Sequence, residues 1–170
     1  MPRYRCTSEW EVDASIDRTW DALLDVGEWP RWWRGFRAVE RLAGGEPSGV
    51  GMRIRQHWRS LLPYTAVLDL EMTHVERHRL LEGRATGDMT GTCTWTFEDL
   101  GGRTRVRFTL DVEPTRWWMR LPLPVAGRVF AWNVGAIMGW GSEGLAGLLG
   151  TVVVDRSAGV RARQAGLAGA

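Results

Sequence analysis

The sequence predicts an α+β fold in which a curved antiparallel sheet is covered by one long C-terminal helix. Seven segments alternate apolar and polar residues, which is the pattern of strands that bury a single face. Short breaks, most of them rich in glycine or proline, separate the last six segments, and such short connections join antiparallel neighbours. A long, nearly uncharged segment follows the last strand, and an apolar sheet face needs a helix of this kind to cover it.

The first strand is expected over Tyr4–Val12, where apolar and polar side chains alternate. Asp13–Ser15 supplies an N-cap for a helix that Gly27 ends. A second short helix is expected over Glu28–Arg34, with Pro30 in its first turn. Two short helices therefore connect the first strand to the rest of the sheet.

Six further strands account for the middle of the chain. They are expected at Phe36–Leu42, Met52–Trp58, Tyr64–Val75, Leu80–Thr86, Met89–Phe97 and Thr104–Val112. After Pro122 and Pro124, a broad apolar stripe predicts the covering helix over Val125–Leu149. Residues 156–170 lack periodicity and are expected to form a disordered tail, which leaves residues 1–155 as a single domain.

Composition limits the classes of protein to which this chain can belong. Its 170 residues suffice for one core, and its shares of hydrophobic (44%) and charged (25%) residues are those of a globular domain. The net charge of +2 comes from arginines and acidic residues that alternate along the chain, so no nucleic-acid partner is expected. Two cysteines cannot form a disulfide framework and the N-terminus shows no apolar export signal, which predicts a cytoplasmic protein.

A membrane-anchored alternative rests on Val129–Val154. Its only charge is Glu143, and it contains a G-x-x-x-G pattern at Gly135 and Gly139. Its polar and small residues make it less apolar than a typical membrane span. The stretch also fits a long helix buried against a sheet, so no stable membrane insertion is expected.

Three polar residues fall on faces that are otherwise apolar. Gln56 and Tyr64 alternate with inward-facing strand residues, and Asn133 lies on the covering helix near Phe130 and Ile137. A buried amide or phenol needs a hydrogen-bond partner. Each of the three therefore either bonds a neighbouring group of the protein or contacts a ligand. In an enzyme they would be the candidate catalytic residues for proton transfer.

Arg84 shares one face of its strand with Glu82, while Leu81 and Ala85 occupy the other. The phase of the strand favours Leu81 and Ala85 inside, which places Arg84 in solvent. If Arg84 pointed inward instead, its guanidinium would bind a carboxylate or enolate oxygen. It is therefore a candidate ligand-binding residue.

The sequence predicts no metal site and no cofactor. His74 and His78 have the spacing of zinc ligands only on a helix, yet they fall at the end of a strand and in its turn. The glycine motifs that bind phosphates or dinucleotides are missing, and so is the nucleophile elbow of the hydrolases. Any reaction would therefore use ordinary side chains.

Eleven tryptophans are more than a core of this size needs. Strand alternation directs large apolar residues toward the covering helix. We expect a cavity lined by Trp58, Leu68, Met72, Trp95, Phe97, Phe108, Trp118, Phe130 and Ile137. The competing interpretation is that the rings simply fill the core. Glycines of the covering helix fit both, because they allow either a close approach to the sheet or a cavity walled by rings.

Four short sequence words stand out along the chain. They are Trp29-Pro30-Arg31-Trp32-Trp33, Gly49-Val50-Gly51-Met52, Ala85-Thr86-Gly87-Asp88-Met89-Thr90-Gly91 and Gly102-Arg103-Thr104-Arg105-Val106. With the order of elements over residues 4–150, they resemble the SRPBCC or START-like superfamily, in particular its polyketide cyclase/dehydrase branch. The resemblance implies a helix-grip fold, in which a seven-stranded sheet wraps the last helix around a deep apolar cavity. The chain has Val134-Gly135 where this branch is expected to have a His-Asp pair.

The resemblance implies a protein without a cofactor that binds a hydrophobic or polycyclic small molecule. The first hypothesis is a polyketide cyclase/dehydratase-like enzyme of secondary metabolism, which folds a flexible substrate in a dry pocket. The alternative is a non-catalytic carrier or sensor for a lipid or pigment. Either protein would be a monomer or a homodimer.

Overall fold

The computed structural model describes residues 3–117 and 126–157, which form eight strands and four helical segments. The strands are β1 (Tyr4–Val12), β2 (Phe36–Ala43), β3 (Arg53–Arg59), β4 (Thr65–Glu76), β5 (Leu80–Gly87), β6 (Met89–Asp99), β7 (Thr104–Pro114) and β8 (Val153–Asp155). The helices are α1 (Ile16–Leu24), the 3-10 turn η1 (Val26–Glu28), α2 (Trp29–Trp32) and α3 (Ala126–Leu149). Every predicted strand and helix is therefore present, with ends close to the expected residues.

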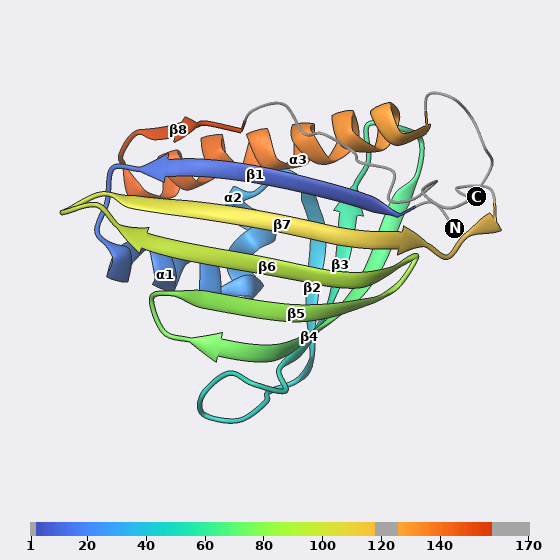
Figure 1. The fold of residues 1–170 in the computed structure, drawn as a ribbon, viewed down its shortest axis with the longest axis horizontal. Coiled ribbons are helices and arrows are strands. Elements are labelled where there is room, and N and C mark those ends of the chain that lie inside the picture. The colour runs from blue at the N-terminus through green and yellow to red at the C-terminus, as the bar shows by residue number, and fades with distance from the viewer. Residues whose placement is uncertain (1–2, 118–125, 158–170) are drawn as a thin grey trace, which may run out of the picture.

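All eight strands belong to one sheet with the order β2-β3-β4-β5-β6-β7-β1-β8, and every pair is antiparallel. Strands β2 to β7 form a meander, and β1 joins it beside β7. Figure 1 shows the sheet bending around the helices, with β4–β7 on one side and β2 and β3 on the other. Helix α3 runs alongside β1. This arrangement is the helix-grip fold that the sequence predicted.

The eighth strand corrects the expected number of seven. Val153–Asp155 pairs with the end of β1, and Arg156 continues this contact through a backbone N–H that donates to the Glu9 carbonyl at 2.8 Å. The hydroxyl of Ser157 accepts the Glu9 N–H at 3.0 Å. Three residues are too few to show an alternating pattern, so only the pairing reveals this strand. The rest of the predicted tail, residues 158–170, lies outside the described residues.

Alternation decides which side chains reach the core. On β3, Ile54, Gln56 and Trp58 are buried, while the residues between them are exposed or half-buried. The same period holds on β7, where Phe108 and Leu110 are among the buried residues. These inner faces meet the short helices and α3 in one hydrophobic cluster.

Helix α3 presents a continuous buried face to the sheet and the short helices. Val134, Ile137, Met138 and Leu145 are all buried on this face. Within residues 3–117 and 126–157, no helix combines the length and the apolar character that crossing a membrane requires.

Candidate functional site

The described residues border two small cavities inside the core. We call them the Gln56 cavity, with a volume of about 20 Å³, and the Leu81 cavity, with a volume of about 30 Å³, each after a residue that borders it alone. Trp29, Leu70, Cys93 and Trp95 border both cavities. Spaces of this size hold about one or two water molecules each. Neither of these two spaces, as the described residues border them, has the size of the deep cavity that the resemblance implies.

The wall of the Gln56 cavity is mostly aromatic. Six rings border it, and they belong to Trp29, Trp33, Phe36, Trp58, Trp95 and Phe108. Leu68, Leu70, Leu110, Ala85, Met138 and Cys93 complete the apolar part of the wall, and Gln56 is its one polar side chain. These residues come from α2 and the residue that follows it, from six strands of the sheet (β2 to β7) and from α3, so the cavity lies where the sheet, the short helices and α3 meet.

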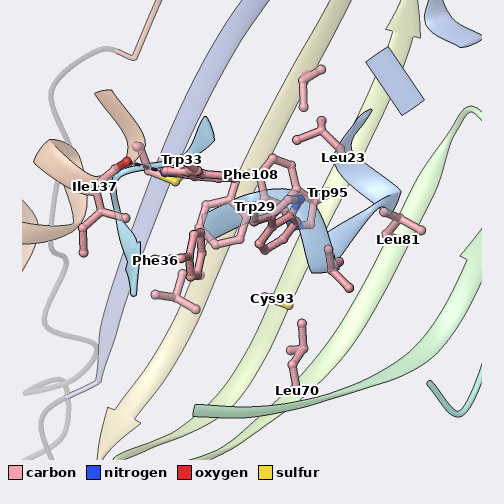
Figure 2. Close-up of a cluster of buried hydrophobic side chains, with 14 of the residues drawn as sticks. Leu23, Trp29, Trp33, Phe36, Leu70, Leu81, Cys93, Trp95, Phe108 and Ile137 are labelled. Carbon is pink, nitrogen blue, oxygen red and sulfur yellow. Dashed lines mark hydrogen bonds between the residues drawn. The ribbon is translucent and has the colours of Figure 1, made fainter. Parts of the chain in front are cut away.

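The rings pack against one another at angles that aromatic pairs favour. The Trp33 ring is perpendicular to Phe36 and to Trp95, with centroids 4.9 and 6.1 Å apart. Trp95 in turn lies 4.6 Å from Phe108. Figure 2 shows these rings gathered between the strands and the helices. The wall therefore offers flat ring faces and edges to any molecule that enters it.

Two glycines of α3 allow the tryptophans at the end of α2 to pack directly on the helix. The Trp33 indole N–H donates to the Ile137 carbonyl at 2.7 Å, as the dashed line in Figure 2 marks. A Cβ at Gly141 would lie 2.6 Å from Trp33 Cζ2, and one at Gly144 would overlap the carbonyl of Trp32. Close approach therefore explains both glycines, which the sequence had left undecided between packing and a cavity.

Gln56 has a defined orientation in the cavity wall. The side chain is only 4% exposed, and its Oε1 accepts a hydrogen bond from Trp58 Nε1 at 3.0 Å. Because an indole nitrogen can only donate, this contact fixes the oxygen of the amide toward Trp58 and leaves Nε2 at the other corner. Of the three candidate catalytic residues, Gln56 is the one that borders either of these two cavities.

Cys93 carries the second side chain in the wall that is a candidate for a chemical reaction. Burial raises the pKa of its thiol to about 12, although a bond from the Gly83 backbone acts in the opposite direction. The thiol is therefore protonated at neutral pH and acts as a small apolar side chain. Cys6 is also buried and free, and β7 separates its strand from that of Cys93.

The structure brings about half of the expected ligand-binding residues to the cavities. Trp58, Leu68, Trp95 and Phe108 border the Gln56 cavity, and Met72 borders the Leu81 cavity.

Three expected lining residues pack elsewhere. Phe97 contacts Trp20 with ring centroids 4.8 Å apart, and Phe130 stacks on Tyr4 at 4.7 Å. Ile137 is buried against the Gly35 backbone. All three face the inside of the fold as predicted, but alternation does not say which part of the core a side chain reaches.

Two further expected residues fall outside the site. Arg84 lies exposed on the outer face of β5 beside Glu82, because Leu81 and Ala85 take the inner face. It cannot reach either cavity, which corrects its candidacy as a ligand clamp. Trp118 lies outside the described residues.

Tyr64 belongs to a polar network away from the cavity walls. Its hydroxyl donates to the Asp88 carboxylate, which also accepts from the Val67 N–H at 2.9 Å and from Arg116 Nε at 2.6 Å. Burial alone would raise the pKa of Asp88, but the three hydrogen bonds outweigh it and lower that pKa. Burial and then the bond to Asp88 raise the pKa of Tyr64 to about 12. At neutral pH a neutral phenol therefore faces an ionised carboxylate.

This network joins three segments, which we call the loop rim: residues 60–64 between β3 and β4, the Gly87-Asp88 turn where β5 ends and β6 begins, and residues 115–117 after β7. The Thr115 N–H donates to the Asp88 carbonyl at 3.0 Å, and the Thr115 hydroxyl donates to the Gly87 carbonyl at 2.6 Å. The buried Asp88 is thus the common acceptor for groups from the other two loops of the rim.

Asn133 ties α3 to the same rim. Its Oδ1 accepts the Leu61 N–H at 2.8 Å and the Ser60 hydroxyl at 3.3 Å. Tyr64 and Asn133 therefore bond neighbouring groups of the protein, which is the structural alternative that the sequence left open for both.

Sequence reasoning did not select Asp88, Trp29 or Trp33 as site residues. Asp88 reads as an ordinary turn residue after Gly87, and nothing in the sequence shows that three donors converge on it. The two tryptophans offered a better signal, because residues four apart lie on one face of a helix and bury together.

Comparisons with known proteins agree with this fold. A family model described as polyketide cyclase/dehydrase and lipid transport matches residues 3–150. The Zhui aromatase/cyclase from Streptomyces sp. R1128 is 16% identical, with a TM-score of 0.71 over 86% of this chain and 93% of that one. A START superfamily protein from Mycobacterium smegmatis is 18% identical, with a TM-score of 0.68 over 86% of this chain and 97% of the other. At identities of 16% and 18%, the likeness to these two structures shows the fold alone. The search among curated proteins found no match.

Proposed function

Because the chain belongs to the polyketide cyclase/dehydrase and lipid transport family, as its sequence words indicated, we propose that it binds a hydrophobic small molecule between the sheet and α3. The observation that carries the proposal is the ring-lined wall of the Gln56 cavity. Ligand sites of this kind are mostly apolar, with a few polar groups that orient the ligand. Gln56 matches that description within an otherwise apolar wall.

Ligand binding requires the wall to open. A drug-sized molecule needs roughly 300 to 1,000 Å³, whereas the two cavities have volumes of about 20 and 30 Å³. Trp29 and Trp95 border both spaces, so their rings are the large side chains whose displacement we expect to join them. We infer that the ligand enters by displacing tryptophan side chains rather than by filling a preformed chamber.

The proposed role is that of a carrier or sensor. The described wall offers one amide, Gln56, and one thiol with a pKa of about 12, Cys93, and neither group exchanges protons readily near neutral pH. Tyr64 and Asn133 are engaged in the loop rim. Binding needs none of these groups to ionise, so the wall suits holding a ligand better than acid–base chemistry.

A polyketide cyclase/dehydratase-like enzyme of secondary metabolism is the second candidate. The family description and the likeness to an aromatase/cyclase favour it. Such an enzyme would act mainly by holding a flexible substrate in a reactive shape within the rings.

Thermal melting and tryptophan emission test the binding function. A panel of tetralin, anthracene and a long-chain fatty alcohol should include at least one compound that raises the melting temperature and changes the emission of the buried indoles, since a ligand bound only by the folded state stabilises it. If no compound does either at its solubility limit, the proposal fails.

Incubation with a linear poly-β-ketone thioester then separates the two roles. Recovery of the thioester, with the same products as form in buffer alone, supports a carrier. Faster or redirected cyclisation supports the enzyme instead.

A further inference from the structure

We propose that the Gln56 amide recognises a neutral acceptor oxygen on the ligand, so that the preferred ligand is a cyclic, mostly apolar molecule with a ketone or similar carbonyl. The inference rests on the proposed binding function and adds the chemical class of the ligand. It starts from the one polar side chain in the wall of the Gln56 cavity.

The Gln56 amide has a donor left over. Its oxygen is occupied by the Trp58 N–H, and this pairing leaves Nε2 with two N–H donors. Among residues 3–117 and 126–157, the one side-chain hydrogen bond of Gln56 is the one that its oxygen accepts from Trp58, and its nitrogen donates to no protein acceptor. The side chain is more than nine-tenths buried and borders the cavity. This nitrogen is not fully enclosed by the protein, so a ligand oxygen at this point would gain a hydrogen bond that the protein does not supply.

A second unpaired donor belongs to the same wall. Trp29 borders both cavities, and its indole N–H is buried without a hydrogen-bond partner in the described residues. The wall offers few hydrogen-bond acceptors, because the Gln56 oxygen already accepts from Trp58 and the Cys93 sulfur accepts poorly. The free hydrogen-bonding group of the described wall is therefore a donor, Gln56 Nε2, and displacement of the Trp29 ring would add a second one. Both favour a ligand that accepts hydrogen bonds over one that donates them.

The wall also selects a neutral ligand. Neither cavity is bordered by a charged side chain within the described residues. A carboxylate placed there would lose its hydration without gaining a cation, which is far more costly than burying a carbonyl that is hydrogen-bonded. A ketone oxygen fits both conditions.

A matched pair of ligands tests the inference. Tetralin and 1-tetralone differ by a carbonyl in place of one methylene, and equilibrium dialysis measures the Kd of each. We expect Gln56→Met to raise the Kd of 1-tetralone about tenfold and to change the Kd of tetralin less than threefold, because only the ketone loses a hydrogen bond. Asn133→Ala is the control. It removes an amide that is bonded in the loop rim and borders neither cavity, so the ratio of the two Kd values should stay within threefold of the wild-type ratio.

An infrared measurement on the wild type keeps the inference testable even if the variant does not fold. The carbonyl band of bound, 13C-labelled 1-tetralone should lie at lower wavenumber than in an alkane solvent, because a donated hydrogen bond weakens the C=O bond. 1-Naphthoate, an anion of similar size, should bind at least tenfold more weakly than 1-tetralone.

Three results would overturn the inference: a carbonyl band at its alkane position, an equal effect of Gln56→Met on both ligands, or tighter binding of the anion. Each of them leaves hydrophobic binding itself intact. If neither tetralin nor 1-tetralone binds the wild type while another compound of the panel does, the inference fails and the proposed function stands. If no compound of the panel binds, both fail.

Discussion

The core around the Gln56 cavity and the loop rim are built by opposite means. In the core, rings pack on glycine-lined surfaces of α3, and a single buried amide keeps a free donor. In the rim, one buried carboxylate accepts from Tyr64, Val67 and Arg116. The carboxylate, phenol and guanidinium groups therefore hold loops together, while the apolar wall faces the cavities. The difference implies that ligand binding and the anchoring of the loops can be altered separately.

The largest expected effect comes from filling the space that the rings of the core occupy. Gly141→Ala and Gly144→Ala should each lower the free energy of unfolding by about 3 kcal/mol, because the new methyl groups would clash with Trp33 and with the backbone of Trp32. Urea denaturation measures the change.

Two other glycines of α3 provide matched controls. A Cβ at Gly139 or Gly147 would meet nothing within 4 Å, so their substitution by alanine should stabilise the protein by about 0.5 to 1 kcal/mol. Equal effects at all four positions would show that helix propensity, and not ring packing, sets these residues.

In the rim, Asp88→Ala should cost about 2 to 3 kcal/mol of unfolding free energy, because Tyr64, Val67 and Arg116 lose their common acceptor. Glu82→Gln, on the exposed outer face of β5, serves as a control and should change stability by less than about 0.5 kcal/mol. A near-neutral Asp88→Ala would mean that the network does not hold the loops.

The stability of the protein in acid should depend on the ionisation of the same carboxylate. The hydrogen bonds around Asp88 lower its pKa below the ordinary value of 3.8. Its contribution to stability is therefore complete above pH 3.8 and is lost as the pH falls through the lower, folded-state pKa. Between pH 6 and pH 2, the unfolding free energy of Asp88→Asn should fall by about 1 kcal/mol less than that of the wild type. Parallel curves for the two proteins would contradict the assignment.

The smallest effects are expected for the two rim residues that had looked catalytic. Tyr64→Phe and Asn133→Ala each remove contacts that tie loops, so each should cost about 1 kcal/mol of stability. The Kd of tetralin, measured by equilibrium dialysis, should stay within twofold of the wild type. A tenfold change in that Kd would place the residue in the binding site after all.

Much of this fold could be predicted, because a period of two along a strand fixes which face is buried. The same reasoning placed Leu81 and Ala85 inside and Arg84 outside on β5. Alternation gives direction and not depth, which is why Phe97 and Phe130 were expected at the cavity although they pack on other rings. The network at Asp88 could not be predicted, since it joins loops that are distant along the chain.

The most direct test of the division between core and rim is the affinity for tetralin in two variants. Ala85 is buried at the wall of the Gln56 cavity, so Ala85→Val fills part of the space that a ligand would use. Thr86→Val, on the exposed face of the same strand, is its control. Equilibrium dialysis should show binding at least tenfold weaker in Ala85→Val and unchanged within twofold in Thr86→Val and Asn133→Ala. Unchanged binding in Ala85→Val together with weakened binding in Asn133→Ala would place the ligand at the rim and contradict the account.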